Sequence, residues 1–188
     1  MSGTEGQSVR MCPACGAAGP GSVGECQELF AQVLGREFAD PALYRAHRLV
    51  VDAYCLQHPE QYMKSSKSAA AHLAGMCWSL EHGLSLNMPV ALSRWLNGAR
   101  TCAPVTPPAP RQRGELNLGC LLGVTDSEDY LATASEWARS AWNAWSVHWP
   151  QARRWVEEAI AASMNRTGTR HKGTGSARPT GRSRTSRR

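Results

Sequence analysis

The sequence lacks any long hydrophobic run. No segment reaches the roughly 18–20 uninterrupted apolar residues that a membrane-spanning helix requires. The first seven residues also lack the basic start and the apolar stretch of a secretory signal peptide. We therefore expect a soluble protein that stays in the cytoplasm and does not associate with a membrane.

Acidic residues are missing from the end of the chain. Residues 165–188 contain eight arginines and lysines and no acid, out of 21 basic and 15 acidic residues in the whole chain. Subtraction leaves 13 basic against 15 acidic residues in 1–164, so the formal net charge of +6 belongs to the tail. This distribution excludes a basic nucleic-acid-binding body. Non-specific association of nucleic acid with the tail alone remains one functional hypothesis.

Alternating patterns typical of β-strands are nearly absent, and helical patterns dominate. Apolar residues recur at intervals of three and four over 25–38, and Asp40-Pro41 provides an N-cap and a first-turn proline for a second helix that stops at His58-Pro59. Caps and periodicity predict further helices over 65–83, 89–96, 127–148 and 150–164. The predicted fold class is therefore all-α, a bundle of five or six helices.

Composition divides the chain into three parts. Residues 1–23 are rich in glycine, proline and serine and are expected to form a loop that carries a cysteine pair. Residues 24–164 form the predicted helical domain, which a proline-rich loop interrupts at about 101–114. Residues 165–188 have almost no apolar side chains to offset the entropy of ordering, so they are predicted to be disordered.

The chain also lacks an even number of cysteines, since it has seven. In a reducing compartment, cysteines are more typical of metal ligands or core residues than of disulfides. Cys12 and Cys15 form a Cys-x-x-Cys knuckle, and Cys26 lies in the first turn of the first predicted helix, where the helix dipole favours a thiolate. This spacing predicts a metal site, with Zn²⁺ as the expected ion. The alternative is a redox-sensitive dithiol.

A fourth ligand is expected from a histidine on a neighbouring helix. Offsets of seven and eleven place His47, Tyr54 and His58 on one helical face. Antiparallel packing would bring the end of the second helix beside the start of the first, and therefore His58 beside Cys26. The predicted tetrahedral set is Cys12, Cys15, Cys26 and His58, with His72 as the alternative fourth ligand.

The sequence leaves the role of the metal open. A closed set of four protein ligands would be structural and would join the N-terminal loop to the helices. Three ligands and an open position could activate water, with His47, Asp52 and His72 nearby as general bases. We expect a zinc-stabilised interaction or regulatory module with an unidentified protein partner. The alternative is a metal-dependent enzyme, such as a hydrolase.

A set of short motifs is spread over residues 11–156. They are Cys12-Pro-Ala-Cys15-Gly, Gly24-Glu-Cys26, His47-Arg-Leu-Val-Val-Asp52-Ala-Tyr54, Gln57-His58-Pro59, Ala71-His72-Leu73, Cys77, Leu80-Glu81-His82-Gly83, Pro107-Pro108, Arg113-Gly114 and the stretch Trp137 to Trp145. In combination they resemble an uncharacterised bacterial family, domain-of-unknown-function family 5946. The resemblance implies one site formed by Cys12, Cys15, Cys26, His47, His58, His72 and Cys77. It implies no particular activity.

Overall fold

The described part of the chain is mainly helical. The computed structural model describes residues 10–19, 21–84, 88–98 and 101–169. The helices in these ranges are α1 (Val23–Ala39), α2 (Pro41–Tyr44), α3 (His47–Gln57), α4 (Pro59–Tyr62), α5 (Ser66–Glu81), α6 (Met88–Asn97), the 3₁₀ helix η1 (Leu118–Leu121), α7 (Ser127–Ala144), the 3₁₀ helix η2 (Ser146–His148) and α8 (Trp149–Thr169). The described residues contain no strand, only an isolated bridge between Met11 and Ala18. The predicted all-α class is confirmed.

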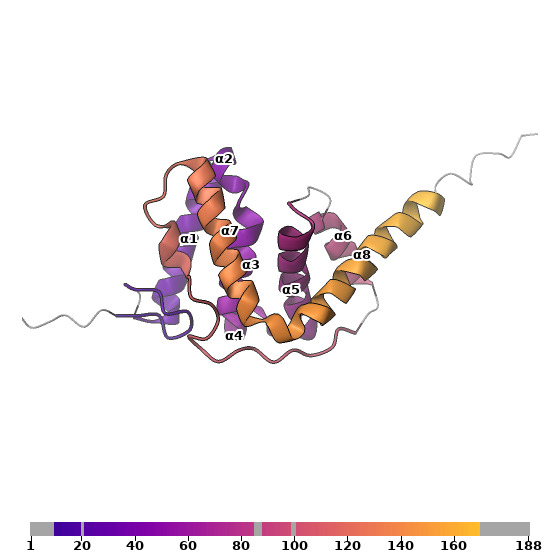
Figure 1. Ribbon diagram of the computed structural model, residues 1–188, viewed down its shortest axis with the longest axis horizontal. Helices are drawn as coiled ribbons and strands as arrows, with labels where there is room; N and C mark the ends of the chain where they lie inside the picture. Colours follow the sequence, from indigo (N-terminus) through magenta and orange to yellow (C-terminus); the bar gives the residue numbers. More distant parts are fainter. Residues whose placement is uncertain (1–9, 20, 85–87, 99–100, 170–188) are drawn as a thin grey trace, which may run out of the picture.

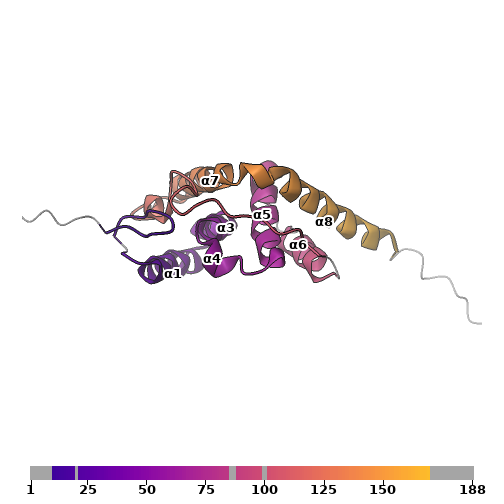
Figure 2. The same ribbon diagram turned by 90° about the horizontal axis from the view of Figure 1, so that it is seen from below.

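The helices form two groups that meet at α3 and α5. Figure 1 shows α1, α2, α3 and α7 on one side and α5, α6 and α8 on the other. The main packing partners of α3 are α7 and α5, and those of α8 are α5 and α6. In Figure 2, α7 and α8 run along one side of the molecule, opposite α1 and α4. None of the helices in the described part of the chain is long and apolar enough to cross a bilayer.

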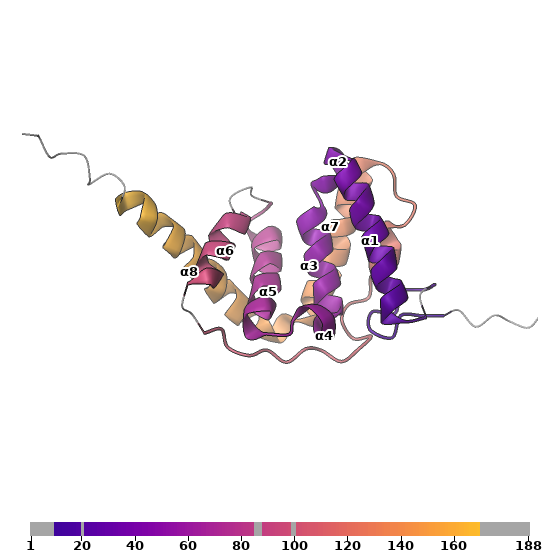
Figure 3. The same cartoon turned by 180° about the vertical axis from the view of Figure 1, so that it is seen from behind.

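The segment between α6 and α7 connects the two groups at one end of the molecule. Residues 101–117 contain no helix, and Figure 3 shows them passing below α5 and α4 towards the N-terminal loop. Contact with that loop is direct, because the backbone N–H of Arg111 donates to the carbonyl of Ala14 at 2.9 Å. The N-terminal loop is thus held against a segment about one hundred residues further along the chain.

Side-chain caps fix where several helices begin. The Asp40 carboxylate accepts a hydrogen bond from the N–H of Ala42 at 2.8 Å, with Pro41 in the first turn as predicted. Ser65 forms a capping box with Ser68 at the start of α5, and Asp126 caps α7. These caps satisfy amide groups that the first helical turn leaves without partners.

Several helix boundaries differ from the sequence prediction. The helix expected over 127–148 ends at Ala144, and residues 146–148 form the separate 3₁₀ helix η2. The helix expected over 41–57 is divided at residues 45–46, where the N–H of Ala46 donates to Leu43, three residues back, and the tighter turn ends α2. At the other end, α8 continues to Thr169, so residues 165–169 of the expected disordered tail are helical. The rest of that tail, residues 170–188, lies outside the described residues, together with the hypothesis of nucleic-acid association through it.

Candidate metal centre

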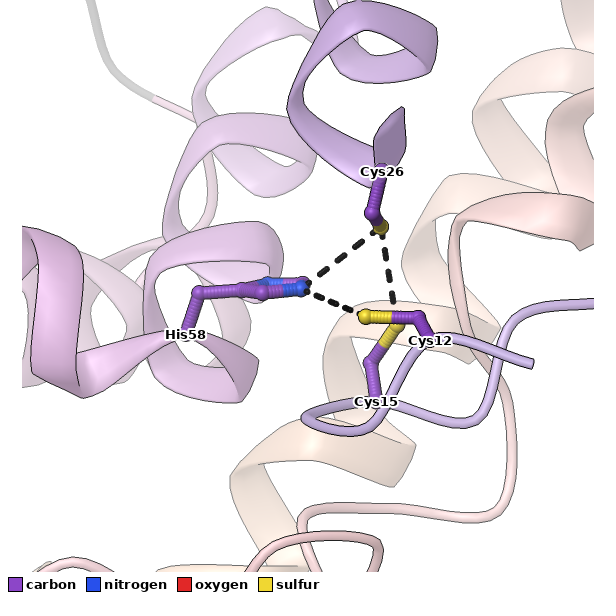
Figure 4. A group of neighbouring side chains, drawn as sticks. All are labelled: Cys12, Cys15, Cys26 and His58. Carbon is purple, nitrogen blue, oxygen red and sulfur yellow. Dashed lines mark hydrogen bonds between the residues drawn. The ribbon is translucent and has the colours of Figure 1, made fainter. Parts of the chain in front are cut away.

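The Cys-x-x-Cys loop is a tight turn that buries both thiols. The N–H of Cys12 donates to the carbonyl of Ala17, and the N–H of Gly16 donates to the carbonyl of Cys12, each at 2.9 Å. Gly16 has a φ of +77°, in the left-handed region that a residue with a side chain adopts only with strain. The turn therefore closes on itself, and both sulfur atoms lie against the helical body (Figure 4).

The other two donors come from helix ends. Cys26 is the fourth residue of α1, in the turn that follows the Ser22 N-cap, whose hydroxyl accepts from the N–H of Glu25 at 3.1 Å. His58 is the residue between α3 and α4, and Pro59 begins α4. Figure 4 shows His58 and Cys26 pointing towards the two knuckle sulfurs from separate helices. The proximity of Cys26 and His58 expected from antiparallel packing is observed.

The four donor atoms have the spacing of a tetrahedral site. The Nε2 atom of His58 lies 3.6 Å from Sγ of Cys12 and 3.6 Å from Sγ of Cys26, and the Sγ atoms of Cys15 and Cys26 are 3.8 Å apart. Metal–sulfur bonds of about 2.3 Å and a metal–nitrogen bond of about 2.0–2.1 Å require separations of about 3.8 Å between sulfurs and about 3.5–3.6 Å between sulfur and nitrogen. The arrangement is compatible with one bound metal ion.

This group is both closed and buried. All four donor atoms lie within 4.8 Å of one another, and the exposed fractions of Cys12, Cys15, Cys26 and His58 are 0, 7, 0 and 1%. Among the described residues, no second group of three or more histidine, cysteine or acidic side chains has such spacing. Three sulfurs and one imidazole nitrogen would fill all four coordination positions of a tetrahedral metal ion, with none left for water.

Hydrogen bonds within the four-residue group favour the thiolate form of Cys26. The bond from Cys15 is the largest of the effects that together lower the pKa of Cys26 to about 4; His58 contributes to this lowering, and burial opposes it. The same bond raises the pKa of Cys15, which acts as the donor. Thiolates, not thiols, bind metal ions, so an incoming ion would displace the remaining thiol protons.

One tautomer of His58 is fixed by its own helix. Its Nδ1 atom lies 2.9 Å from the backbone carbonyl of Tyr54, which can only accept, so Nδ1 carries the proton. With a metal ion bound, Nε2 would be the nitrogen that offers its lone pair to the ion. A ligand histidine whose second nitrogen donates to a carbonyl is the usual arrangement at metal sites.

A buried arginine and glutamine support the centre, and the sequence analysis missed their role. Arg113, only 2% exposed, donates to the carbonyls of Gln57 and Pro108 and to both carboxylate oxygens of Glu60. Gln57 donates to the carbonyls of Arg113 and Leu116. The loop before η1 is thereby fixed to Gln57, which precedes His58, and to Glu60, two residues after it. The motif Arg113-Gly114 was the only sequence signal.

The Glu60–Arg113 pair makes stability depend on pH. The hydrogen bonds from Arg113 hold the pKa of Glu60 below its ordinary value. A lowered folded-state pKa contributes stability above the unfolded value of about 4.3, and this is lost as the pH falls through the folded pKa. We expect Glu60→Gln to lower the free energy of unfolding by about 1 kcal/mol at pH 7, a small effect because the Glu60 side chain is 61% exposed.

The measurement for Glu60 is urea unfolding of both proteins between pH 3 and 7. The difference between the two proteins should shrink towards pH 3, while any acid-driven loss of a metal ion is common to both and cancels. A difference that is constant over this range would show that the carboxylate charge is not what stabilises Arg113.

The alternative fourth ligand, His72, lies elsewhere. Its Nδ1 atom is 2.9 Å from the carboxylate of Asp52, which is buried and also pairs with Arg48 at 2.6 Å. Asp52 and His72 thus face each other across α3 and α5, as antiparallel packing predicts. Gly75 makes room for this pair, because a Cβ there would lie 1.9 Å from the guanidinium of Arg48. The arrangement joins two helices and does not include a cysteine.

His47 is also paired with a buried carboxylate. Its Nδ1 atom lies 2.7 Å from Glu37, which is fully buried and accepts a second hydrogen bond from the hydroxyl of Tyr130 at 2.9 Å. His47 begins α3 and His58 follows its last residue, so helical rise separates them by about 16 Å. The seven positions that the resemblance joined into one site are therefore divided, since His47, His72 and Cys77 are not in the four-residue group.

The remaining cysteines have ordinary structural surroundings. Cys55 and Cys77 are buried, and burial raises the pKa of Cys55 above its usual range and that of Cys77 to about 12. Cys102 and Cys120 are partly buried, and burial raises the pKa of both thiols. These four thiols are protonated at neutral pH, in contrast to Cys26.

Comparisons with known proteins place this site in a family without an assigned activity. No curated protein matches the chain. No solved structure matches it either. The model of the Family of unknown function (DUF5946) matches residues 10–146, which include all four residues of the metal centre. The chain belongs to this family.

Proposed function

We propose that Cys12, Cys15, Cys26 and His58 bind one Zn²⁺ ion, and that the ion makes the protein a metal-stabilised interaction or regulatory module. The observation that carries the proposal is the spacing of the four buried donor atoms, which all lie within 4.8 Å of one another, with the two nitrogen–sulfur separations from His58 at 3.6 Å and the Cys15–Cys26 sulfur separation at 3.8 Å. Three thiolates and one imidazole form a donor set that zinc prefers over magnesium or calcium, which favour oxygen ligands. A cysteine-rich site of this kind also fits a reducing compartment, so we place the protein in the cytoplasm.

A structural role is favoured over a catalytic one. Four protein ligands complete a tetrahedral zinc site, whereas catalytic zinc sites keep one position for water. The histidines that would serve as general bases are engaged elsewhere, His47 with Glu37 and His72 with Asp52. The ion would supply folding energy by joining the N-terminal loop, α1 and the α3–α4 junction, three segments that no disulfide connects.

A cavity beside the centre supports a role in binding a partner. It has a volume of about 420 Å³, and its walls are Pro13, Ala14, Val23, His58, Glu60, Gln61, Pro110 and Arg113. These residues come from the knuckle, α1, the α3–α4 junction and the loop before η1, the same segments that the ion and Arg113 hold together. Binding of the ion would therefore shape the cavity, and its prolines, alanine and valine fit an apolar side chain of a protein partner.

Metal content tests this proposal directly. The protein is purified without a metal-affinity column, and bound zinc is quantified by mass spectrometry for the wild type, His58→Ala and His72→Ala. We expect one zinc ion per chain in the wild type and in His72→Ala, and a loss of zinc in His58→Ala, because only His58 faces the sulfurs. A wild-type protein without metal after anaerobic reconstitution would refute the proposal, and loss in His72→Ala alone would refute the ligand assignment.

A further inference from the structure

A zinc ion in this group would leave a buried negative charge. Three thiolates and a neutral imidazole around a divalent ion sum to one net negative charge. The four residues are buried, so water is not available to stabilise that charge. Burial of an unpaired charge is unfavourable unless hydrogen-bond donors surround it. The protein must therefore direct donors at the sulfur atoms.

The backbone supplies one such donor. A hydrogen bond from the backbone of Ala17 lowers the pKa of Cys15, which means that it favours the thiolate. Cys26 lies in the first turn of α1, where its own N–H donates to the carbonyl of Ser22 at 3.2 Å and is not directed at a sulfur. Stabilisation of the Cys26 thiolate must come from a side chain.

The hydroxyl of Tyr54 is placed to provide it. Tyr54 is 0% exposed, and its ring is held between Phe30, with ring centroids 3.8 Å apart and planes within 4°, and His58, with centroids 4.0 Å apart. Its hydroxyl oxygen is buried and has no hydrogen-bond partner of ordinary geometry among the described residues. Both stacking partners place this ring beside Cys26, because Nε2 of His58 lies 3.6 Å from the Cys26 sulfur and Phe30 lies one turn after Cys26 in α1.

We propose that the Tyr54 hydroxyl donates a hydrogen bond to the sulfur of Cys26 and is a positioning residue of the metal centre, an inference that rests on the proposed function. A tyrosine phenol has an ordinary pKa of about 10, so at neutral pH it carries its proton and can donate. The backbone carbonyl of the same residue fixes the tautomer of His58. Tyr54 thus acts on two of the four ligands, one through its main chain and one through its side chain.

The expected consequence is tighter binding of zinc and a less reactive Cys26. A hydrogen bond withdraws charge from a thiolate, which lowers its nucleophilicity and offsets the negative charge of the centre. Stacking between Phe30 and His58 holds the Tyr54 ring, and therefore its hydroxyl, in one orientation. The loss of such a supporting interaction weakens metal binding by about 10–100-fold in comparable sites.

The test compares full-length wild type with Tyr54→Phe, which keeps the stacked ring and removes only the hydroxyl. Zinc affinity is measured by competition with a chromophoric chelator, the cobalt-substituted proteins give the thiolate-to-metal charge-transfer spectrum, and iodoacetamide labelling with peptide mapping gives the reactivity of Cys26. We expect zinc affinity to fall by about tenfold or more, the charge-transfer band to shift, and Cys26 to be alkylated faster. A merely structural role would not move the cobalt spectrum.

Tyr62→Phe is the matched control, because Tyr62 packs edge-on against Tyr54 with ring centroids 5.7 Å apart. Its backbone N–H donates to the carbonyl of His58 at 3.2 Å, a bond that the substitution leaves in place. It should match the wild type in affinity, spectrum and labelling. Equal effects of the two variants, or a Tyr54→Phe protein within about twofold of the wild type, would overturn the role of Tyr54 while leaving zinc binding intact. A wild type that binds no zinc would overturn both proposals.

Discussion

We expect Cys12→Ser to release the metal ion. The free energy of unfolding should fall by about 4 kcal/mol when the free zinc concentration is about 1,000-fold above the dissociation constant of the site. Cys12 lies 3.6 Å from His58 and is fully buried, so its loss opens the tetrahedron and leaves a hydroxyl that binds zinc poorly. A ligand that binds only the folded state adds its binding free energy to stability. Removal of zinc by a chelator should therefore destabilise the wild type by a similar amount.

Thermal and urea unfolding with and without chelator measure this effect. Cys55→Ser is the control, since Cys55 is also buried but lies outside the centre, so its serine variant carries a comparable penalty for a buried hydroxyl and should keep its response to chelator. Cys12→Ser should unfold at the same urea concentration with and without chelator. If it still responds as the wild type does, Cys12 is not a ligand and the assignment of the four-residue group is wrong.

Local sequence signals were sufficient for the ligand group because each of its members has one. The knuckle is contiguous, Cys26 follows a helix start, and His58 precedes a proline that ends one helix and begins the next. One rule of packing, that short connections make helices antiparallel, was enough to place Cys26 beside His58 rather than beside His72. The same rule placed Asp52 opposite His72, and the structure has them 2.9 Å apart.

The surroundings of the site could not be predicted in the same way, because they depend on contacts distant in sequence. Arg113 contacts Gln57, 56 residues away, through the loop before η1, and periodicity cannot place a loop. The carboxylate that pairs with His47 belongs to Glu37, which looks like any other acid in a helix sequence. Only the packing of α7, which brings Tyr130 to the other oxygen of Glu37, buries it.

The break between α2 and α3 has no local signal at all. Arg45 and Ala46 are good helix formers, so propensity and periodicity both predict one helix over 41–57. Burial of Leu43 and Ala46, which are 6 and 0% exposed, decides the turn instead. Tertiary packing overrides a weak local preference here, as it commonly does for short helices.

Gln57→Leu is expected to lower the free energy of unfolding by about 3–6 kcal/mol, because three buried groups lose a partner at about 1–3 kcal/mol each, with some relaxation. The fully buried Gln57 side chain accepts from the indole N–H of Trp137 at 3.1 Å and donates to the carbonyls of Arg113 and Leu116 at 3.1 and 2.7 Å. Leucine fills the same volume but satisfies none of them. It would remove the side-chain links from the end of α3 to α7 and to the loop before η1, while the bond from Arg113 to the backbone carbonyl of residue 57 would remain.

Gln61→Leu is the control for Gln57→Leu, because it also removes a side-chain amide but leaves the hydrogen bonds of Gln57 in place. Gln61 lies one turn further on, is only half-buried and has a buried side-chain oxygen without a partner, so its replacement should change stability by less than about 1 kcal/mol. Urea unfolding of the chelated proteins isolates the polar network from the metal. Because Gln57 precedes His58, zinc affinity should fall in Gln57→Leu and not in Gln61→Leu. Equal stabilities of the two variants would mean that the three hydrogen bonds of Gln57 do not hold the α3–α4 junction, and that the ion alone positions His58.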